Sequence, residues 1–202
     1  LLKGILTVSK AIPAKSTEAI LEDYLFVLEG DKLEVTASDK EITMKTVITV
    51  DSTEEEGRFA VPARQLNDLL KELPDQPITI STISENQFKC AWESGESTLP
   101  YFNPDDYPES QTTGDDANVV EFPGQSLADG IGRTLYASSD EENRPVMNSI
   151  FFDITPNSTT LVASDLQKLT CYTADDVKAE VPCSFILNKR HAAVLKSVIG
   201  KD

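Results

Sequence analysis

The chain has very little of the side-chain chemistry on which catalytic and metal sites most often depend. It contains one histidine, His191, which argues against zinc sites built from several histidines and against Ser-His-Asp triads. The three cysteines, Cys90, Cys171 and Cys183, are an odd number without CxxC spacing, which argues against a disulfide framework or a metal knuckle. No run approaches the roughly 18 apolar residues of a membrane span. We therefore expect reduced thiols, no cofactor, no metal, no membrane contact and a cytoplasmic location.

Positive charge is scarce as well. The 202 residues include 18 Lys and Arg against 34 Asp and Glu, which gives a formal net charge of −16. Apolar residues make up 40% of the chain and charged residues 26%, as in ordinary globular domains, so disorder is not expected. Taken as a total, this acidity argues against a nucleic-acid partner.

A weak internal repeat relates the two ends of the chain. At an offset of 126 residues, 12 of 76 aligned pairs are identical without a gap. Both copies show the same predicted order, which is a helix, three strands, and a fourth strand that leads into a second helix. The first copy adds two strands, in PITISTI and QFKCAWES, that the second lacks. The identical pairs include Ala37-Ser38-Asp39 with Ala163-Ser164-Asp165, Phe26 with Phe152, and Phe59 with Phe185.

This order predicts an α+β fold in which helices pack on one face of antiparallel sheets. A stretch rich in Pro, Asp and Gly, from about 104 to 118, predicts a linker. We therefore expect one domain over residues 1–117 and a second over residues 118–202. Because the chain begins without Met, we expect it to start a few residues inside its first domain. Because the second copy lacks the two additional strands, we expect the second domain to be incomplete.

The basic residues are concentrated around the four predicted helices. These regions hold 11 of the 18 Lys and Arg but 7 of the 34 Asp and Glu, a net charge of +4 against −20 for the remainder. A helix repeats at about 100° per residue, and Arg64 and Lys71 fall opposite the leucine stripe of the second helix. One such face is ordinary, but four in an acidic chain favour attraction of a phosphate backbone. The regions are residues 1–15, 62–73, 126–144 and 188–202.

Six stretches of the chain have a recognisable order and spacing: LLKGILTVSKAI, AILEDYLFVLEGDKLEVTASDKEITM, FAVPARQLNDLLKELPD, STLPYFNPDDYPE, LVASDLQKL and FILNKRHAAVL. In these stretches the chain resembles the bacterial DNA sliding clamp, the beta subunit of DNA polymerase III. The resemblance implies the DNA-clamp fold, with repeated domains of two helices on antiparallel sheets, and a third domain that is absent here. It also implies a non-enzymatic processivity factor, a homodimer ring around double-stranded DNA, with the replicative polymerase catalytic subunit and the clamp loader as partners.

The helix faces and the resemblance together predict which residues face DNA. Their role would be phosphate attraction without base readout, since a clamp that read sequence could not slide. His191 is expected to contact solvent or phosphate rather than to act in catalysis. The predicted DNA-facing residues are Lys3, Lys10, Lys15, Arg64, Lys71, Arg133, Arg144, Lys189, Arg190 and Lys196.

The resemblance further implies a hydrophobic pocket for short linear peptides, half of it in the second domain, and a ring contact at the edge strand near Leu99. The family commonly has Gly, His and Arg where this chain has Leu166, Gln167 and Lys168, which leaves its peptide preference open. Core packing is an equal alternative for Met147 and Leu169. The expected half-pocket comprises Met147, Ser164, Leu166, Gln167, Lys168 and Leu169.

Two other classes of protein remain as alternatives at this stage. An acidic protein-interaction scaffold could use the same helices to bind acidic partners without DNA. A nuclease would need clustered carboxylates on the helix faces, and these faces have few.

Overall fold

The structure is a computed structural model that describes residues 1–13, 15–51, 56–109, 114, 119–141 and 143–199. Its contacts divide the chain into two units, Leu1–Gln111 (unit 1) and Thr112–Asp202 (unit 2). The predicted domain boundary between 117 and 118 lies outside the described residues, so it stays a prediction.

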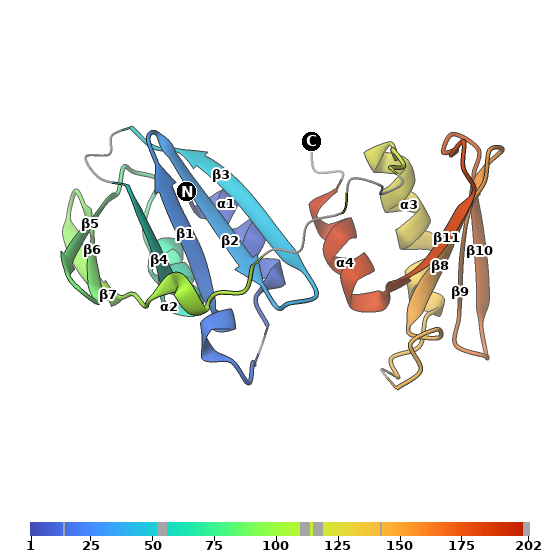
Figure 1. Cartoon of the computed structure of the whole chain (residues 1–202), viewed down its shortest axis with the longest axis horizontal. Helices are drawn as coiled ribbons and strands as arrows, with labels where there is room; N and C mark the ends of the chain where they lie inside the picture. Colours follow the sequence, from blue (N-terminus) through green and yellow to red (C-terminus); the bar gives the residue numbers. More distant parts are fainter. Residues whose placement is uncertain (14, 52–55, 110–113, 115–118, 142, 200–202) are drawn as a thin grey trace. The chain divides into compact units, whose positions relative to one another are not determined.

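Unit 1 is built on a four-stranded antiparallel sheet in the order β3-β2-β1-β4, with α1 and α2 on one face (Figure 1). Strand β1 turns into β2 through a two-residue hairpin, because Glu29 pairs with Lys32 and Gly30 has φ of 57°. The elements are α1 (Leu2–Val8), η1 (Ser9–Ala11), η2 (Ala19–Glu22), β1 (Asp23–Glu29), β2 (Lys32–Ser38), β3 (Thr43–Thr49), β4 (Gly57–Pro62) and α2 (Ala63–Glu72).

The core of unit 1 lies between this sheet and the two helices. Tyr24 and Phe26 point to it from alternate positions of β1, and both are fully buried. The helices contribute the apolar stripes predicted from the sequence, because residues three to four apart share a face. The buried stripe residues are Ile5, Val8, Leu66 and Leu70.

A second, three-stranded sheet in the order β5-β6-β7 extends the core of unit 1. Phe88 of β6 is buried there, and the Phe59 ring packs against Phe88 and Tyr101 at centroid distances of 6.2 and 5.7 Å. Two of these strands confirm the predictions for PITISTI and QFKCAWES, and the third is the edge strand implied near Leu99. The elements are β5 (Thr79–Ser84), β6 (Gln87–Trp92), β7 (Gly95–Pro100) and the turn η3 (Pro104–Asp106).

The prediction of a linker from about residue 104 is wrong at its start, because residues 102–108 (the strap) pack on the sheet of unit 1. Phe102 exchanges two backbone hydrogen bonds with Ala60, of 2.8 and 3.1 Å. The buried Tyr107 hydroxyl donates to the carbonyl oxygen of Thr36 at 3.3 Å. The strap crosses the face of the sheet opposite the helices (Figure 1). Its Pro and Asp content resembles a loop, but a buried tyrosine anchors it.

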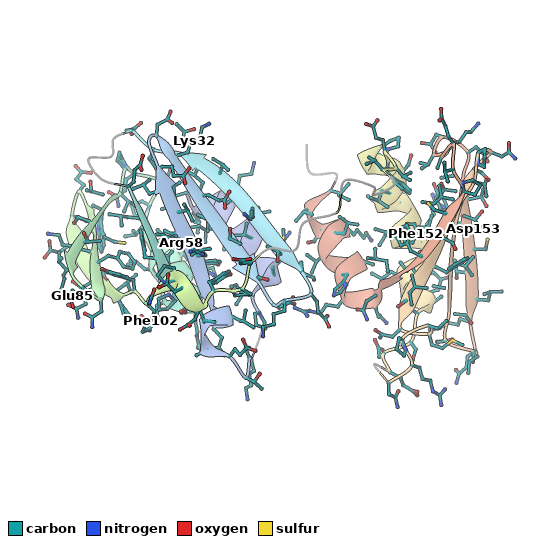
Figure 2. All side chains as sticks on the ribbon, in the orientation of Figure 1. Lys32, Arg58, Glu85, Phe102, Phe152 and Asp153 are labelled. Atoms are coloured by element: carbon teal, nitrogen blue, oxygen red, sulfur yellow. The ribbon has the colours of Figure 1, made fainter. Side chains whose placement is uncertain are left out.

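Unit 2 repeats the four-stranded sheet and the helix pair, in the order β10-β9-β8-β11 with α3 and α4 on one face (Figure 1). Phe152 of β8 is buried in its core, while the next residue, Asp153, is exposed (Figure 2). Both units therefore confirm the predicted α+β fold. The elements are α3 (Gly124–Thr134), η4 (Leu135–Ala137), β8 (Ser149–Ile154), β9 (Thr159–Ser164), β10 (Leu169–Ala174), β11 (Cys183–Asn188) and α4 (Lys189–Val198).

The two units differ on the sheet face opposite their helices. At the offset of 126, Phe151 and Ile186 correspond to Leu25 and Ala60 beneath the strap of unit 1. Phe151 and Ile186 are 40% and 47% exposed, whereas Leu25 is 8% exposed and Ala60 is fully buried. Within the described residues, nothing in unit 2 takes the place of the strap.

Candidate nucleic-acid interface

In unit 1 the predicted DNA-facing residues lie on and beside α1 and α2. Lys3 of α1 and Arg64 and Lys71 of α2 are exposed, on the sides turned away from the core. Lys10 is half-buried in η1, and Lys15 is exposed in the segment that follows. Because α1 and α2 contact each other, these cations belong to one helical layer.

Ion pairing leaves most of these cations available. Arg64 Nε lies 4.0 Å from Asp68 Oδ2, one turn along α2, with both side chains well exposed. Exposed pairs of this kind contribute little to stability, about 0–1 kcal/mol. Within the part of the chain that the structure describes, no carboxylate lies within ion-pair distance of Lys3, Lys15 or Lys71. Their ammonium groups can pair with an external anion without breaking an internal contact.

In unit 2 a groove between α3 and α4 brings Arg133 and Lys196 together. Gly132 leaves the room that Lys196 occupies, because a Cβ there would lie 2.9 Å from the lysine Nζ. The Arg133 guanidinium lies 5.6 Å from the centre of the Tyr172 ring, which is a cation–π contact. Asp129 also lines the groove, so it is mixed in charge.

The start of α4 holds two further predicted residues in different environments. The Asn188 side chain caps the helix by accepting from the Arg190 backbone N–H at 2.8 Å, and the Arg190 side chain is exposed. The Lys189 side chain is 27% exposed, and its Nζ lies 2.7 Å from Asp140 Oδ1 and 3.0 Å from the Ser138 carbonyl oxygen. The hydrogen bond from Lys189 lowers the pKa of Asp140. Lys189 is therefore held by internal acceptors.

Arg144 and His191 complete the predicted set. Arg144 is 57% exposed in the loop before β8, and its Nε lies 3.1 Å from Glu141 Oε2. His191 is half-buried on α4 beside Arg190. The pair of Arg144 is exposed enough to exchange for a phosphate.

The predicted half-pocket is organised by the turn between β9 and β10. Asp165 Oδ1 accepts from the backbone N–H groups of Gln167 and Lys168, at 3.0 and 2.7 Å. Ser164 Oγ accepts from the N–H of Leu166, which has φ of 75°. Lys168 Nζ lies 2.8 Å from Asp165 Oδ2, and this hydrogen bond is the main cause that lowers the pKa of Asp165 to about 2. Side-chain acceptors thus fix the turn.

This turn presents apolar side chains to solvent. Leu166 and Leu169 are 69% and 72% exposed, so core packing does not explain Leu169. Met147 is half-buried in the loop before β8. Lys168 also donates to the Tyr136 carbonyl oxygen at 3.3 Å, and Tyr136 is 62% exposed. Exposed apolar groups beside a fixed turn are suited to binding another chain.

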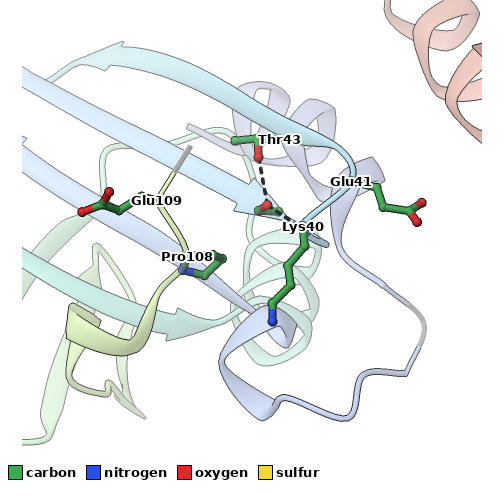
Figure 3. A pocket seen from close by; sticks show the side chains of 6 residues that line it. Lys40, Glu41, Thr43, Pro108 and Glu109 are labelled. Atoms are coloured by element: carbon green, nitrogen blue, oxygen red, sulfur yellow. Dashed lines mark hydrogen bonds between the residues drawn. The ribbon is translucent and has the colours of Figure 1, made fainter. Parts of the chain in front are cut away.

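Unit 1 has a turn of the same build at the corresponding place (Figure 3). Asp39 Oδ1 accepts from two backbone N–H groups, Ser38 Oγ accepts from Lys40 N–H, and Lys40 has φ of 76°. Ser38 Oγ also lies 2.9 Å from Thr43 Oγ1. Here the side chains are polar rather than apolar. They line a pocket formed by Ser38, Lys40, Glu41, Thr43, Pro108 and Glu109.

The residue predicted at the ring contact, Leu99, lies in β7, an edge strand of the three-stranded sheet. Its side chain is 8% exposed and joins the core of unit 1. Leu99 therefore stabilises β7 through its buried side chain, and its place at a ring contact stays a prediction.

Groups for other chemistry are few among the described residues. They include no cluster of three or more His, Cys, Asp or Glu that could hold a metal ion, and no helix long and apolar enough to cross a membrane. The three cysteines are free, and burial raises the pKa of Cys90 to about 11, so its thiol is unreactive.

The sequence analysis missed the side chains that hold the basic residues of unit 2. Tyr172 contacts Arg133 and Asp140 pairs with Lys189, across many residues of sequence. An alternating strand pattern could have placed Tyr172 on the helix side of β10. No sequence pattern pointed to Asp140.

Comparisons with known proteins identify the family. The model of the DNA polymerase III beta subunit, N-terminal domain, matches residues 1–111. The chain is 30% identical to a beta sliding clamp of Halalkalibacterium halodurans over 80% of this chain and 44% of that protein. It is 26% identical to a beta sliding clamp of Pseudomonas aeruginosa over 90% of this chain and 48% of that protein. The chain thus spans about half the length of the curated relatives it matches.

Solved structures agree at the level of the fold. A DNA polymerase III subunit beta from Pseudomonas aeruginosa superposes with a TM-score of 0.90 at 24% identity, over 100% of this chain and 55% of that one. A putative DNA polymerase III beta subunit from Eubacterium rectale gives the same TM-score at 23% identity. With the family match over residues 1–111, the chain belongs to the DNA polymerase III beta subunit family.

Proposed function

We propose that this chain is part of a sliding clamp, a processivity factor that encircles double-stranded DNA as a homodimer ring and is opened by a clamp loader. The observation that carries the proposal is the placement of basic side chains on the outer faces of all four helices of a strongly acidic protein. Membership of the DNA polymerase III beta subunit family supports it.

The charge distribution suits loose binding to duplex DNA. The helix regions carry about +4 and the remainder −20, so a phosphate backbone is attracted to the helices and repelled elsewhere. Flexible lysines such as Lys3 and Lys71 can contact phosphates without fixed geometry. Contacts to phosphate carry no sequence information, which sliding requires.

The tethering role uses the turn at Ser164–Leu169. We assign to it half of a docking site for short peptides of the replicative polymerase catalytic subunit and the clamp loader. Leu166 and Leu169 supply exposed apolar surface, and the hydrogen bonds of Asp165 hold the turn in one conformation before a peptide binds. Such preorganisation reduces the entropic cost of binding.

The chain itself is proposed to be non-enzymatic and cytoplasmic. Its helix faces carry lysines and arginines but few carboxylates. This composition suits a surface that attracts phosphate, whereas a nuclease site needs clustered carboxylates to hold metal ions. Free cysteines are in keeping with a reducing compartment. The alternative function, a scaffold for acidic protein partners, is separated from this one by its behaviour toward DNA.

Duplex DNA binding by the 202-residue chain tests the electrostatic part of the proposal. The logarithm of the binding constant decreases linearly with the logarithm of the salt concentration, and we expect this slope to become shallower by about one in Lys71→Gln and in Lys196→Gln. Each substitution removes one proposed phosphate contact. Lys45→Gln is the matched control, because Lys45 lies on strand β3 and pairs with Glu34 at 2.9 Å. Equal slopes in all three variants would contradict a helix-borne DNA surface.

Topological linkage is tested with a full-length subunit that contains this chain, loaded on circular nicked DNA. A clamp stays bound as salt rises and leaves when the DNA is linearised. Loss from circular DNA at raised salt would instead indicate plain electrostatic binding.

A further inference from the structure

The loop that joins η4 to β8 in unit 2 is held by a continuous hydrogen-bond network. We define the 138–148 loop as residues 138–141 and 143–148. Within it, the N–H of Ser139 donates to the Met147 carbonyl oxygen at 2.8 Å, and the N–H of Asn148 donates to the Arg144 carbonyl oxygen at 2.9 Å. The Asn148 side chain donates to the Ser139 carbonyl oxygen at 2.7 Å. The two ends of the loop are therefore tied together.

Helix α4 holds this loop from outside. The N–H of Lys189 donates to the Asn148 carbonyl oxygen at 2.9 Å, and the Asn188 side chain donates to Asn148 Oδ1 at 2.8 Å. The Lys189 ammonium then reaches the other end of the loop, where it bonds Asp140 Oδ1 at 2.7 Å and the Ser138 carbonyl oxygen at 3.0 Å. One residue of α4 thus contacts both ends of the loop.

Lys189 and Lys196 lie on the same helix but in opposite situations. The Lys189 side chain is 27% exposed and donates to two internal acceptors. Lys196 is exposed, and no carboxylate among the described residues lies within ion-pair distance of it. A phosphate can bind Lys196 directly, whereas at Lys189 it would have to replace Asp140.

We propose that Lys189 is a positioning residue that holds the 138–148 loop on α4, and that it is not one of the phosphate contacts of unit 2. The loop carries Arg144, a predicted DNA-facing residue, and Met147, a member of the predicted half-pocket. Lys189 therefore sets where two functional side chains lie. The second half of this proposal rests on the proposed function, because it concerns which lysines meet DNA.

The charges around the pair are compatible with this role. Asp140 is exposed, and its pKa is lowered first by the hydrogen bond from Lys189 and also by the charge of Lys168. Lys168 in turn bonds Asp165 and the Tyr136 carbonyl oxygen. The charge of Asp140 thus interacts with a lysine of α4 and, more weakly, with a lysine of the half-pocket turn.

Amide hydrogen exchange of the 202-residue chain tests the positioning role without any ligand. In Lys189→Gln and in Asp140→Asn we expect the Ser139 and Asn148 amides to lose about tenfold or more of their protection, because the loop opens locally. Lys189→Arg should restore it, since a guanidinium can reach both acceptors. Lys196→Gln is the matched control on α4 and should leave the loop unchanged.

Duplex DNA binding by the same variants tests the second half. Lys189→Gln should keep the wild-type salt slope, whereas in Lys196→Gln the magnitude of this slope should decrease by about one. The inference would be overturned if the loop amides of Lys189→Gln kept their wild-type protection. It would also be overturned if the magnitude of the salt slope of Lys189→Gln decreased by about one. A wild-type slope in Lys196→Gln would instead count against the proposed function, and the exchange result would still decide the role of Lys189.

Discussion

Asp23 is the most perturbed carboxyl group among the described residues of unit 1, and its substitution gives a quantitative test of the packing at the start of β1. It is the first residue of β1, is 6% exposed, and has no ion-pair partner among the residues that the structure describes. Burial, with a smaller contribution from the charge of Glu22, raises its pKa from 3.8 to about 6. The ionised form is therefore disfavoured in the folded protein.

The sign of the effect on stability follows from this direction. Because the folded pKa is above the unfolded one, the group favours folding below about pH 4, and this contribution is lost as pH rises through about 6. One pKa unit corresponds to about 1.4 kcal/mol, so the loss amounts to about 2–3 kcal/mol at neutral pH. Asp23→Asn removes the ionisation. We expect it to match the wild type near pH 4 and to exceed it by about 2 kcal/mol near pH 7.

The assay is urea unfolding at a series of pH values, followed by the fluorescence of the single tryptophan. Trp92 lies in β6, so its signal reports on unit 1 alone. The difference between variant and wild type cancels the other carboxylates, including Asp165, whose lowered pKa acts at more acidic pH. If the difference does not change between about pH 4 and 7, Asp23 ionises freely in the folded protein and the reasoning is refuted.

Three further predictions concern helix packing in unit 2 and a hydrogen bond in unit 1. Gly130→Ala should destabilise unit 2 by about 1–3 kcal/mol, because its Cβ would lie 3.0 Å from the Leu161 side chain in the core, more than offsetting the better helix propensity of alanine. Gly132→Ala should instead be neutral or stabilise unit 2 by up to about 1 kcal/mol, because its Cβ would meet only the flexible end of the Lys196 side chain. Urea unfolding followed by circular dichroism compares the two glycine variants, and equal changes in stability would contradict this prediction. Tyr107→Phe should lower the stability of unit 1 by about 1 kcal/mol, through loss of the bond to the Thr36 carbonyl oxygen, and unchanged Trp92 unfolding would show that the bond contributes nothing.

Much of the fold could be predicted because the apolar stripes of the helices and the internal repeat of the chain are both regular. The stripe of Leu66 and Leu70 identifies one face of α2. The repeat at 126 residues predicts that the same order of elements occurs twice, and the two four-stranded sheets with their helix pairs confirm it. The strap could not be predicted, because Tyr107 is one aromatic residue among prolines and aspartates. Its burial depends on the sheet face that Ala60 and Thr36 form, which is set by strands far along the chain.

The positive charge of the candidate site could be predicted from the sequence, but which of its lysines are free to bind phosphate could not. Helical angles place Lys189 and Lys196 on an outer face, and nothing in that pattern separates them. The separation comes from Asp140, which lies 49 residues before Lys189 and reaches it only through the tertiary fold. Long-range partners of this kind are set by packing, so a local pattern does not reveal them.

The two turns at the end of β2 and of β9 show where binding character resides. Lys40 and Leu166 have φ of 76° and 75°, and in each turn an aspartate accepts two backbone N–H groups. The backbone and its hydrogen bonds are thus repeated, while the side chains are not. At the exposed position unit 1 carries a lysine that pairs with Glu18, and unit 2 carries a leucine that is 69% exposed. The repeat therefore supplies the same rigid frame twice, and the exposed apolar side chains are the reason why we propose the peptide-docking site in unit 2.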